Sequence, residues 1–192
     1  MFENLPVFKT VFEDYDKIID KGLAYYKSKD YPEAIKCFTE CIGYIPTYYP
    51  AYYCRGLVYK EMMYLDRAMS DFRKVIEHEP DLTYGYSGLG KCLSYRGNHR
   101  EALLMFEKAV EIEPNDSIAI FDLGLQFSKM KEYVKSEKTL NRALKINPKD
   151  DLFYNARAFT RLSLKKYKKA IKDAHKAINI DPKCSEYYNL LG

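Results

Sequence analysis

The sequence predicts an all-α protein, a solenoid of antiparallel helix pairs, because three kinds of residue recur together at one constant interval. Glycines stand 34 residues apart and an alanine takes the next slot: Gly22, Gly56, Gly90, Gly124 and Ala158. Small residues follow twelve positions after each of these: Ala34, Ala68, Ala102, Ser136 and Ala170. Prolines keep the same interval: Pro46, Pro80, Pro114, Pro148 and Pro182. With no insertion between copies, one unit is repeated along the chain.

Each copy is interpreted as a first helix, a turn and a second helix. Small residues at positions 8, 20 and 27 of the repeat let the two helices approach closely. A large residue at position 24, such as Phe38 or Phe72, and apolar residues at positions 4, 7 and 11 are expected to fill the space between units. Proline at position 32 has no amide donor and disfavours helix in the residue before it, so the second helix must end there.

In chain order, the period divides the sequence into an extension, five repeats and a partial sixth. The extension, residues 1–14, is expected to form a short helix that covers the first repeat. The last segment, residues 185–192, is expected to be the first helix of a truncated sixth repeat, with Tyr188 and Leu191 at core positions. We interpret the chain as a fragment of a longer repeat protein; self-association through this half-repeat is the alternative. The five repeats are residues 15–48, 49–82, 83–116, 117–150 and 151–184.

With these positions in phase, the sequence resembles the tetratricopeptide repeat family, whose 34-residue unit is a helix-turn-helix with small residues where the helices cross. The fifth copy departs most, since Ala158, Arg161 and Ala174 replace the usual glycine, aromatic residue and phenylalanine. The resemblance implies a right-handed superhelix that acts as a scaffold. A protein or peptide partner would bind in its concave groove.

In that family, the groove is lined by positions 2, 5, 9 and 12 of each first helix. Position 9, occupied by Leu23, Leu57, Leu125 and Phe159, is interpreted mainly as packing. The remaining positions predict a largely apolar and aromatic groove that binds an extended or helical peptide through apolar anchors. The predicted peptide-binding residues, which include two at position 6, are Ile19, Tyr26, Tyr53, Lys60, Tyr84, Ser87, Gly88, Lys91, Ile118, Phe121, Asp122, Leu152 and Asn155.

Gly88 has two interpretations. The helix over residues 83–91 carries Gly85 and Gly88 in addition to the Gly90 that the repeat requires. They represent either tolerated drift or, at Gly88, a notch beside Tyr53, Tyr84 and Phe121 that accepts a bulky ligand side chain.

Co-chaperones of this family hold a C-terminal carboxylate with Lys, Asn and Arg at positions 2, 5, 6 and 9 of three successive repeats. Here these positions carry Ile19, Leu23, Cys54, Tyr84 and Gly88, and no later frame restores the clamp. A chaperone tail is therefore not the expected ligand.

Charge is unevenly distributed. Acidic residues outnumber basic ones over residues 1–116, whereas basic residues dominate residues 117–192, for a total of +4. A basic patch is predicted on one face of the last second helix. It is interpreted as a solvated outer face or, alternatively, as the contact of a targeting or regulatory adaptor with an acidic protein, a membrane or RNA. Nucleic acid and membrane are not the expected partners. The patch contains Lys165, Lys168, Lys169, Lys172 and Lys176.

Composition predicts an intracellular, cytoplasmic protein. The N-terminus lacks the basic start and apolar stretch of a signal peptide, and no apolar run is long enough to span a bilayer. Five cysteines without a regular framework favour reduced thiols. Cys37 and Cys41 stand four apart, but no further ligand at metal-site spacing accompanies them. No metal or cofactor is expected.

Catalysis is not expected either. The three histidines, His78, His99 and His175, occupy unrelated repeat positions, and no phosphate loop, nucleophile elbow or HExxH motif is present. Asp20 and Asp122 both face the predicted groove but stand three repeats apart. Contacts to a ligand's Lys or Arg suit them better than acid–base chemistry. No small-molecule substrate is implied.

Overall fold

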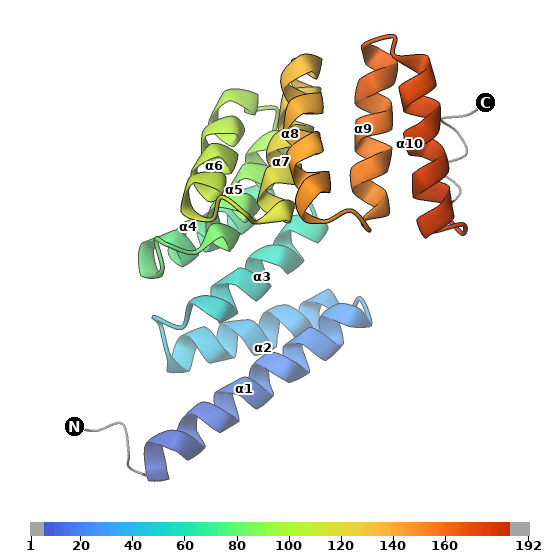
Figure 1. Ribbon diagram of the computed structural model, residues 1–192. Coiled ribbons are helices and arrows are strands. Elements are labelled where there is room, and N and C mark those ends of the chain that lie inside the picture. The colour runs from blue at the N-terminus through green and yellow to red at the C-terminus, as the bar shows by residue number, and fades with distance from the viewer. Residues whose placement is uncertain (1–5, 185–192) are drawn as a thin grey trace. The chain divides into compact units, whose positions relative to one another are not determined.

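The protein is helical over residues 6–184, which are the residues that the computed structural model describes. The helices α3, α5, α7 and α9 begin 34 residues apart, and so do α2, α4, α6, α8 and α10. The helices therefore follow the interval seen in the sequence. Within the described range there are ten of them and no strand (Figure 1): α1 (Pro6–Lys27), α2 (Tyr31–Tyr44), α3 (Tyr49–Glu61), α4 (Leu65–His78), α5 (Thr83–Tyr95), α6 (His99–Ile112), α7 (Ser117–Lys129), α8 (Tyr133–Ile146), α9 (Asp151–Ser163) and α10 (Tyr167–Ile180).

The chain forms two compact units, residues 1–92 and residues 93–192. The first contains α1 to α4 and most of α5, and the second contains the end of α5 and α6 to α10. Helices that follow one another pack together, as α1 does on α2 and α3 on α4 in the first unit, and α7 on α8 and α9 on α10 in the second (Figure 1). Each unit is therefore a stack of antiparallel helix pairs.

Each helix pair is joined by a turn that contains one residue with left-handed backbone. Its φ is 87° at Gly97 and between 58° and 63° at the residues in the same repeat position. Left-handed backbone costs a residue other than glycine about 1–2 kcal/mol. Because four of the five positions lack glycine, helix packing and not local preference sets this turn. The four are Lys29, Met63, Lys131 and Lys165.

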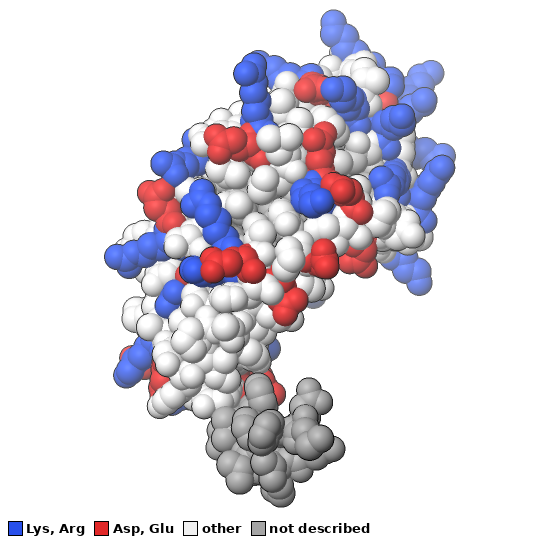
Figure 2. Space-filling model, turned by 90° about the vertical axis from the view of Figure 1, so that its left-hand side faces the viewer, with Lys and Arg blue, Asp and Glu red and all other residues white. Residues whose placement is uncertain are grey.

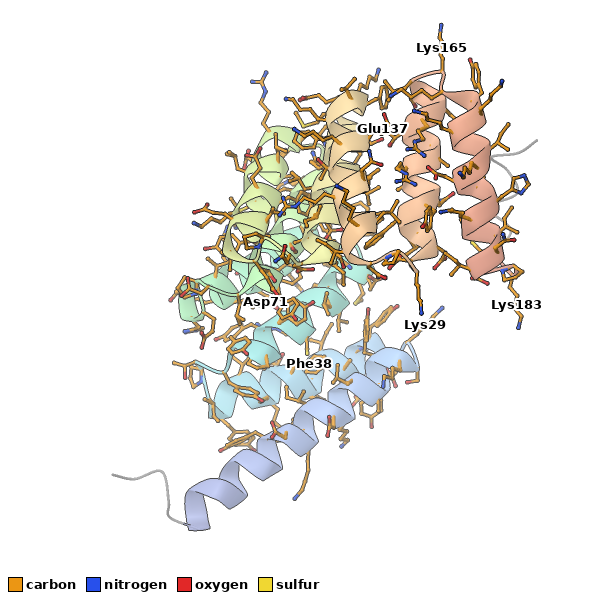
Figure 3. All side chains as sticks on the ribbon, in the orientation of Figure 1. Lys29, Phe38, Asp71, Glu137, Lys165 and Lys183 are labelled. Carbon is orange, nitrogen blue, oxygen red and sulfur yellow. The ribbon has the colours of Figure 1, made fainter. Side chains whose placement is uncertain are left out.

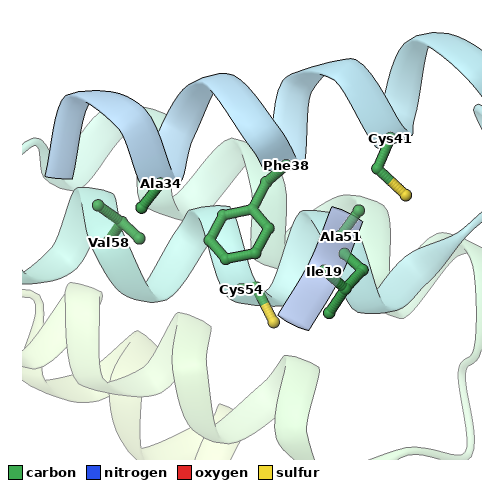
Figure 4. Close-up of a cluster of buried hydrophobic side chains, with 7 residues drawn as sticks. All are labelled: Ile19, Ala34, Phe38, Cys41, Ala51, Cys54 and Val58. Atoms are coloured by element: carbon green, nitrogen blue, oxygen red, sulfur yellow. The ribbon is translucent and has the colours of Figure 1, made fainter. Parts of the chain in front are cut away.

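The predicted close approach of paired helices is present. A Cβ atom added to Gly22 would lie 2.5 Å from the ring of Phe38, and one added to Gly124 would lie 2.8 Å from Leu140 Cδ2. In Figure 4, the Phe38 ring points from α2 toward α3. Small residues at position 8 therefore make room for the large residue at position 24. The buried cluster in this view contains Ile19, Ala34, Phe38, Cys41, Ala51, Cys54 and Val58.

The second unit has an equivalent core between α7, α8, α9 and α10. Phe153 and Tyr154 of α9 are buried against α7 and α8 residues such as Ile120 and Leu144. The ring of Phe121 stacks on Phe153 with centroids 4.5 Å apart. Aromatic packing therefore holds α9 against α7.

Position 7 departs from the predicted apolar packing in three repeats, where it is Lys21, Arg55 and Arg157. Arg55 donates to both carboxylate oxygens of Asp71, at 2.9 and 2.8 Å, and Arg157 makes the same bidentate pair with Asp173. The prediction that apolar side chains fill this position is therefore wrong at Lys21, Arg55 and Arg157.

The described part of the N-terminal extension belongs to the first helix. Residues 6–14 belong to α1 and continue without a break into the helix of the first repeat, so they do not form the separate short helix expected for residues 1–14. The helix expected over residues 185–192 lies outside the described residues. Among the helices described, none combines the length and the apolar character that crossing a bilayer requires.

Candidate peptide-binding site

Tyrosine side chains from α3 and α5 lie together on the first unit. The ring centroid of Tyr53 is 5.7 Å from that of Tyr84 and 6.0 Å from that of Phe72. Tyr84 is 56% exposed, whereas Tyr53 is half-buried. Tyr26 of α1 is half-buried too, and this burial raises the pKa of its phenol. Tyr53 and Tyr84 thus present an aromatic face to solvent.

The polar residues predicted for the groove of the first unit are half-buried. Ser87 and Lys91 lie on α5, and Lys60 lies on the last turn of α3. The Lys60 ammonium is 3.0 Å from the carboxylate of Glu61. This pairing leaves Lys60 less available to a ligand anion.

Two residues predicted to line the groove instead belong to the packing of the first unit. Ile19 is buried in the cluster around Phe38. A Cβ atom on Gly88 would lie 2.5 Å from Phe72 Cε1, so the Phe72 ring occupies the space where a ligand side chain was expected. The notch at Gly88 is therefore absent. Gly85 has a similar role, since its Cβ would lie 2.8 Å from Ile76 Cγ1.

The second unit carries a cavity between α7 and α9, called here the inner cavity, with a volume of about 370 Å³. Leu152 and Phe159 at its rim are each 54% exposed, although both are large and apolar. Phe121 is held in place by its stacking on buried Phe153. The cavity therefore combines fixed and accessible apolar groups. Its walls are Phe121, Leu125 and Ser128 of α7 and Leu152, Asn155, Ala156 and Phe159 of α9.

The cavity contains three of the predicted groove residues: Phe121, Leu152 and Asn155. Two of the predicted residues lie elsewhere: Ile118 is exposed but outside the cavity walls, and Asp122 is buried, which corrects its expected position in the groove.

The predicted peptide-binding residues omit four of the seven described residues that line the cavity: Leu125, Ser128, Ala156 and Phe159. Leu125 and Phe159, at position 9, were assigned to packing, yet both line the cavity. The signal for Leu125 and Phe159 was that position 9 is one of the groove-lining positions in the family that the sequence resembles.

Asn155 and Ser128 are the polar residues among the described walls of the inner cavity. Asn155 is the one with an unsatisfied buried atom. Its Oδ1 atom is buried and accepts no hydrogen bond from the described part of the chain. A buried acceptor without a donor costs about 1–3 kcal/mol.

The predicted basic patch is exposed but not confined to one helix face. Lys168, Lys169, Lys172 and Lys176 lie on α10, whereas Lys165 has left-handed backbone in the turn before that helix. In Figure 3, Lys165 points away from the tip of this turn. Blue side chains crowd the upper right of the space-filling view (Figure 2). The prediction of a shared helical face is thus wrong for Lys165.

The histidines and cysteines do not come together as a site in the described structure. His99 Nδ1 lies 3.3 Å from Gln126 Nε2, and His78 packs 5.9 Å from the ring of Tyr52. No cluster of three or more metal-ligating side chains exists among the described residues. Cys37 and Cys41 are free thiols buried in α2.

Comparison with known proteins identifies the repeat. A tetratricopeptide repeat model matches residues 19–48, 49–82 and 153–184, and a second model of the same name matches residues 93–158. The Hsp70-Hsp90 organizing protein 3 of Arabidopsis thaliana is 37% identical over 84 residues, which are 44% of this chain and 15% of the relative. The Hsp70-Hsp90 organizing protein of Triticum aestivum is 30% identical over 88 residues, 46% of this chain and again 15% of the relative. The matches thus span about a seventh of these relatives.

Solved structures share the fold. A thermophilic TPR protein of Thermus thermophilus aligns with a TM-score of 0.81 at 19% identity, covering 92% of this chain and 98% of the other. Pseudomonas aeruginosa PilF aligns with a TM-score of 0.82 at 18% identity, and the alignment covers 93% of this chain and 81% of PilF. YrrB, described as a TPR protein with an unusual peptide-binding site, aligns with a TM-score of 0.66 at 19% identity. The alignment covers 95% of this chain and 96% of YrrB. The predicted all-α solenoid class is therefore confirmed.

Proposed function

Because the chain belongs to the tetratricopeptide repeat family, we propose that it is a protein-interaction scaffold whose inner cavity binds a peptide segment of a partner through apolar anchors. The observation that carries this proposal is the exposure of Leu152 and Phe159 at the rim of the cavity. Burying one such side chain against a ligand stabilises the complex by roughly 1.5–3 kcal/mol. Two adjacent anchors therefore suffice for specific, reversible binding.

The size and the polarity of the inner cavity support a peptide ligand. Its volume of about 370 Å³ lies at the lower end of ordinary ligand pockets, which suits a side chain or two but not a folded domain. Apolar side chains provide most of the walls, and Asn155 provides one amide NH2 group that can donate to a peptide C=O. An extended or helical segment can seat its apolar residues and still satisfy its backbone.

The proposal includes the absence of a co-chaperone carboxylate clamp. The curated relatives are named organizers of Hsp70 and Hsp90, so a chaperone tail is the obvious competing ligand. Among the residues that the structure describes, neither Lys nor Arg lines the inner cavity, so a terminal carboxylate placed there would lack a counter-charge from them. Burying an unpaired carboxylate is strongly unfavourable. Binding should therefore not depend on a free C-terminus.

The test begins with peptides selected from a random library displayed on phage against the whole chain. Affinities of the selected peptides are then measured for the parent and for Leu152→Ser/Phe159→Ser. Loss of both anchors should weaken binding at least about tenfold, because each exposed side chain contributes about 1 kcal/mol or more when it is covered. Each peptide is measured with a free and an amidated C-terminus, and the two affinities should agree.

A matched variant controls for general loss of surface hydrophobicity. Leu104→Ser/Ile171→Ser removes two apolar side chains that are also exposed on the second unit but lie outside the cavity walls. This variant should retain parental affinity. Selected peptides that bind both variants as tightly as the parent, or that need a free carboxylate, would show that the cavity assignment is wrong.

A further inference from the structure

A second concave surface of the second unit runs along α8, with a volume of about 890 Å³. It is called here the basic cleft, because six of the described side chains that line it are cationic and none of them is acidic. The rings of Phe127 and Tyr154 and the side chains of Leu123 and Leu144 give it apolar walls. The cations are Lys135, Lys138, Arg142, Lys145, Arg157 and Lys176.

Most of this positive charge is not neutralised by the part of the chain that the structure describes. Arg157 is paired with Asp173, and Lys135 lies 2.5 Å from the carboxylate of Glu132. Lys138, Lys145 and Lys176 have no carboxylate partner among the described residues, and Lys176 lies over the ring of Tyr154 at 5.0 Å. The Arg142 guanidinium donates to the carbonyl oxygen of Pro114.

Glu137 is the only acidic residue of α8, and it is already engaged. Its carboxylate accepts hydrogen bonds from Arg161 and Lys166, neither of which lines the cleft. It therefore does not neutralise the charges in the cleft.

Earlier repeats show how these helix positions are used when no anion is expected. Positions 26 and 29 carry Lys74 and Glu77 in α4, joined at 2.7 Å, and Lys108 and Glu111 in α6, joined at 3.1 Å. The same positions in α8 are Arg142 and Lys145. An attractive pair is thus replaced by a repulsive one, which is unfavourable by roughly 0.2–0.5 kcal/mol in the isolated helix. A bound anion would remove this cost.

The chemistry of the cleft favours carboxylates over the other anions. The guanidinium fork of Arg157 is occupied by Asp173, and Arg142 already donates to Pro114, so the planar fork that phosphate groups prefer is only partly available. The remaining cations are lysines, which act as compact point charges. Lys135 lies over the ring of Phe127 and Lys176 over the ring of Tyr154, so neither ring face is open for a nucleic-acid base to stack on.

From this arrangement we propose that the basic cleft binds an acidic segment of a partner protein, in which Asp and Glu are interspersed with apolar residues. The lysines hold the carboxylates, and the apolar walls accept the side chains between them. This site is separate in its residues from the inner cavity and does not depend on the function proposed for that cavity. It would allow one scaffold to hold two segments at once.

The proposal is tested by fluorescence anisotropy with a fluorescein-labelled peptide of sequence EDLEEDLE and the whole chain. The cleft variant is Lys138→Glu/Lys145→Glu, which restores at positions 26 and 29 the basic–acidic order of the earlier repeats and should therefore fold normally by circular dichroism. The control is Lys168→Glu/Lys172→Glu, which changes net charge equally on exposed residues of α10 outside the cleft.

The cleft variant should bind the peptide at least about tenfold more weakly than the parent, whereas the control should change the affinity less than about threefold. Binding by the Leu152→Ser/Phe159→Ser variant should equal that of the parent, which separates this proposal from the inner cavity. Equal losses in the cleft and control variants, or no loss in either, would overturn the assignment. So would tighter cleft-dependent binding of phosphatidylserine vesicles or of an oligouridylate, measured in parallel.

Discussion

Arg157 and Asp173 form a bidentate ion pair between α9 and α10, with Nε 2.8 Å from Oδ2 and Nη2 2.7 Å from Oδ1. The Asp173 side chain is 2% exposed, and its Oδ2 also accepts from Arg161 at 2.6 Å. Arg157 Nη1 donates to Asn141 of α8 at 2.7 Å. One carboxylate therefore holds two guanidinium groups and links three helices of the second unit.

Removing Asp173 should destabilise the protein more than removing its counterpart Asp71. Asp71 neutralises only Arg55, whereas Asp173→Ala would leave both Arg157 and Arg161 without this partner. Breaking a buried ion pair from one side costs about 3–5 kcal/mol. We expect Asp173→Ala to lie in this range and Asp71→Ala below it, measured by urea unfolding followed by circular dichroism.

The control for these substitutions is Lys74→Ala, which removes an exposed pair with Glu77 and should leave the unfolding midpoint unchanged. Equal midpoints for Asp173→Ala and Asp71→Ala would mean that the second guanidinium adds nothing to the role of Asp173.

The constant interval made the helix pairs predictable, but the role of a single repeat position could not be predicted from the interval alone. Position 7 is arginine only where position 23 is aspartate, as in Arg55 with Asp71 and Arg157 with Asp173. Repeats with leucine at position 7 carry Met105 or Thr139 at position 23. This covariation within one chain was the signal for the ion pairs. Assigning one residue type to position 7 from all five repeats together concealed this covariation.

The candidate site was predictable in type but not residue by residue. Ile19 and Tyr53 share position 5, yet Ile19 is buried and Tyr53 is half-buried, because the side chains around each differ in size. Phe159 is exposed at a position assigned to packing. Exposure depends on neighbours in three dimensions, and the repeat alone does not specify them.

Gly88→Ala should destabilise the protein because its new Cβ would lie 2.5 Å from the Phe72 ring. Such overpacking typically costs about 1–3 kcal/mol. Combining Gly88→Ala with Phe72→Leu should cost less than the sum of the two single changes, since the smaller side chain makes room. Thermal unfolding of the single and double variants provides the measurement.

The matched control is Gly43→Ala in α2, where an added Cβ meets nothing within 4 Å. Alanine is the better helix former by about 0.5–1 kcal/mol, so this variant should be as stable as the parent or slightly more so. If Gly88→Ala is as stable as Gly43→Ala, the space beside Gly88 is open. Gly88 could then form the notch for a ligand side chain that the sequence suggested.

Protonation of the Glu137 carboxyl should lower the stability of the folded protein at acidic pH. Burial by itself raises the pKa of this carboxyl, but hydrogen bonds from Lys166 at 2.5 Å and Arg161 at 2.9 Å, with their charges, outweigh burial and lower the pKa below its ordinary 4.5. A pKa lowered by folding stabilises the native state above the unfolded-state value, and this contribution is lost as the pH falls through the folded-state value.

The measurement is the unfolding midpoint of the parent and of Glu137→Gln as the pH is lowered. Glu137→Gln should be less stable than the parent near neutral pH, and the difference should shrink below about pH 4.5 as the parental carboxyl takes up a proton. Glu107→Gln, at an exposed site, should match the parent near neutral pH. A difference between the parent and Glu137→Gln that stays constant with pH would contradict the ion-pair explanation.

The buried cysteines should be unreactive in the folded chain. Burial raises the pKa of the Cys54 and Cys92 thiols to about 11 each, and it also raises the pKa of Cys37 and Cys41. Thiolate is the nucleophilic form, so a rise of about two units in pKa lowers its population about a hundredfold near pH 8. Cys184 is the one cysteine that is not buried.

Iodoacetamide should therefore add once to the native chain, at Cys184, and at all five cysteines in urea, as counted by intact-mass spectrometry. Cys184→Ser should abolish the rapid addition to the native chain and leave the additions at the four buried cysteines in urea unchanged. Because Cys54 lies in the core of the first unit and Cys92 on α5, their alkylation without denaturant would report opening of the helix stack. Alkylation of either before Cys184 would show that this packing opens readily in the native state.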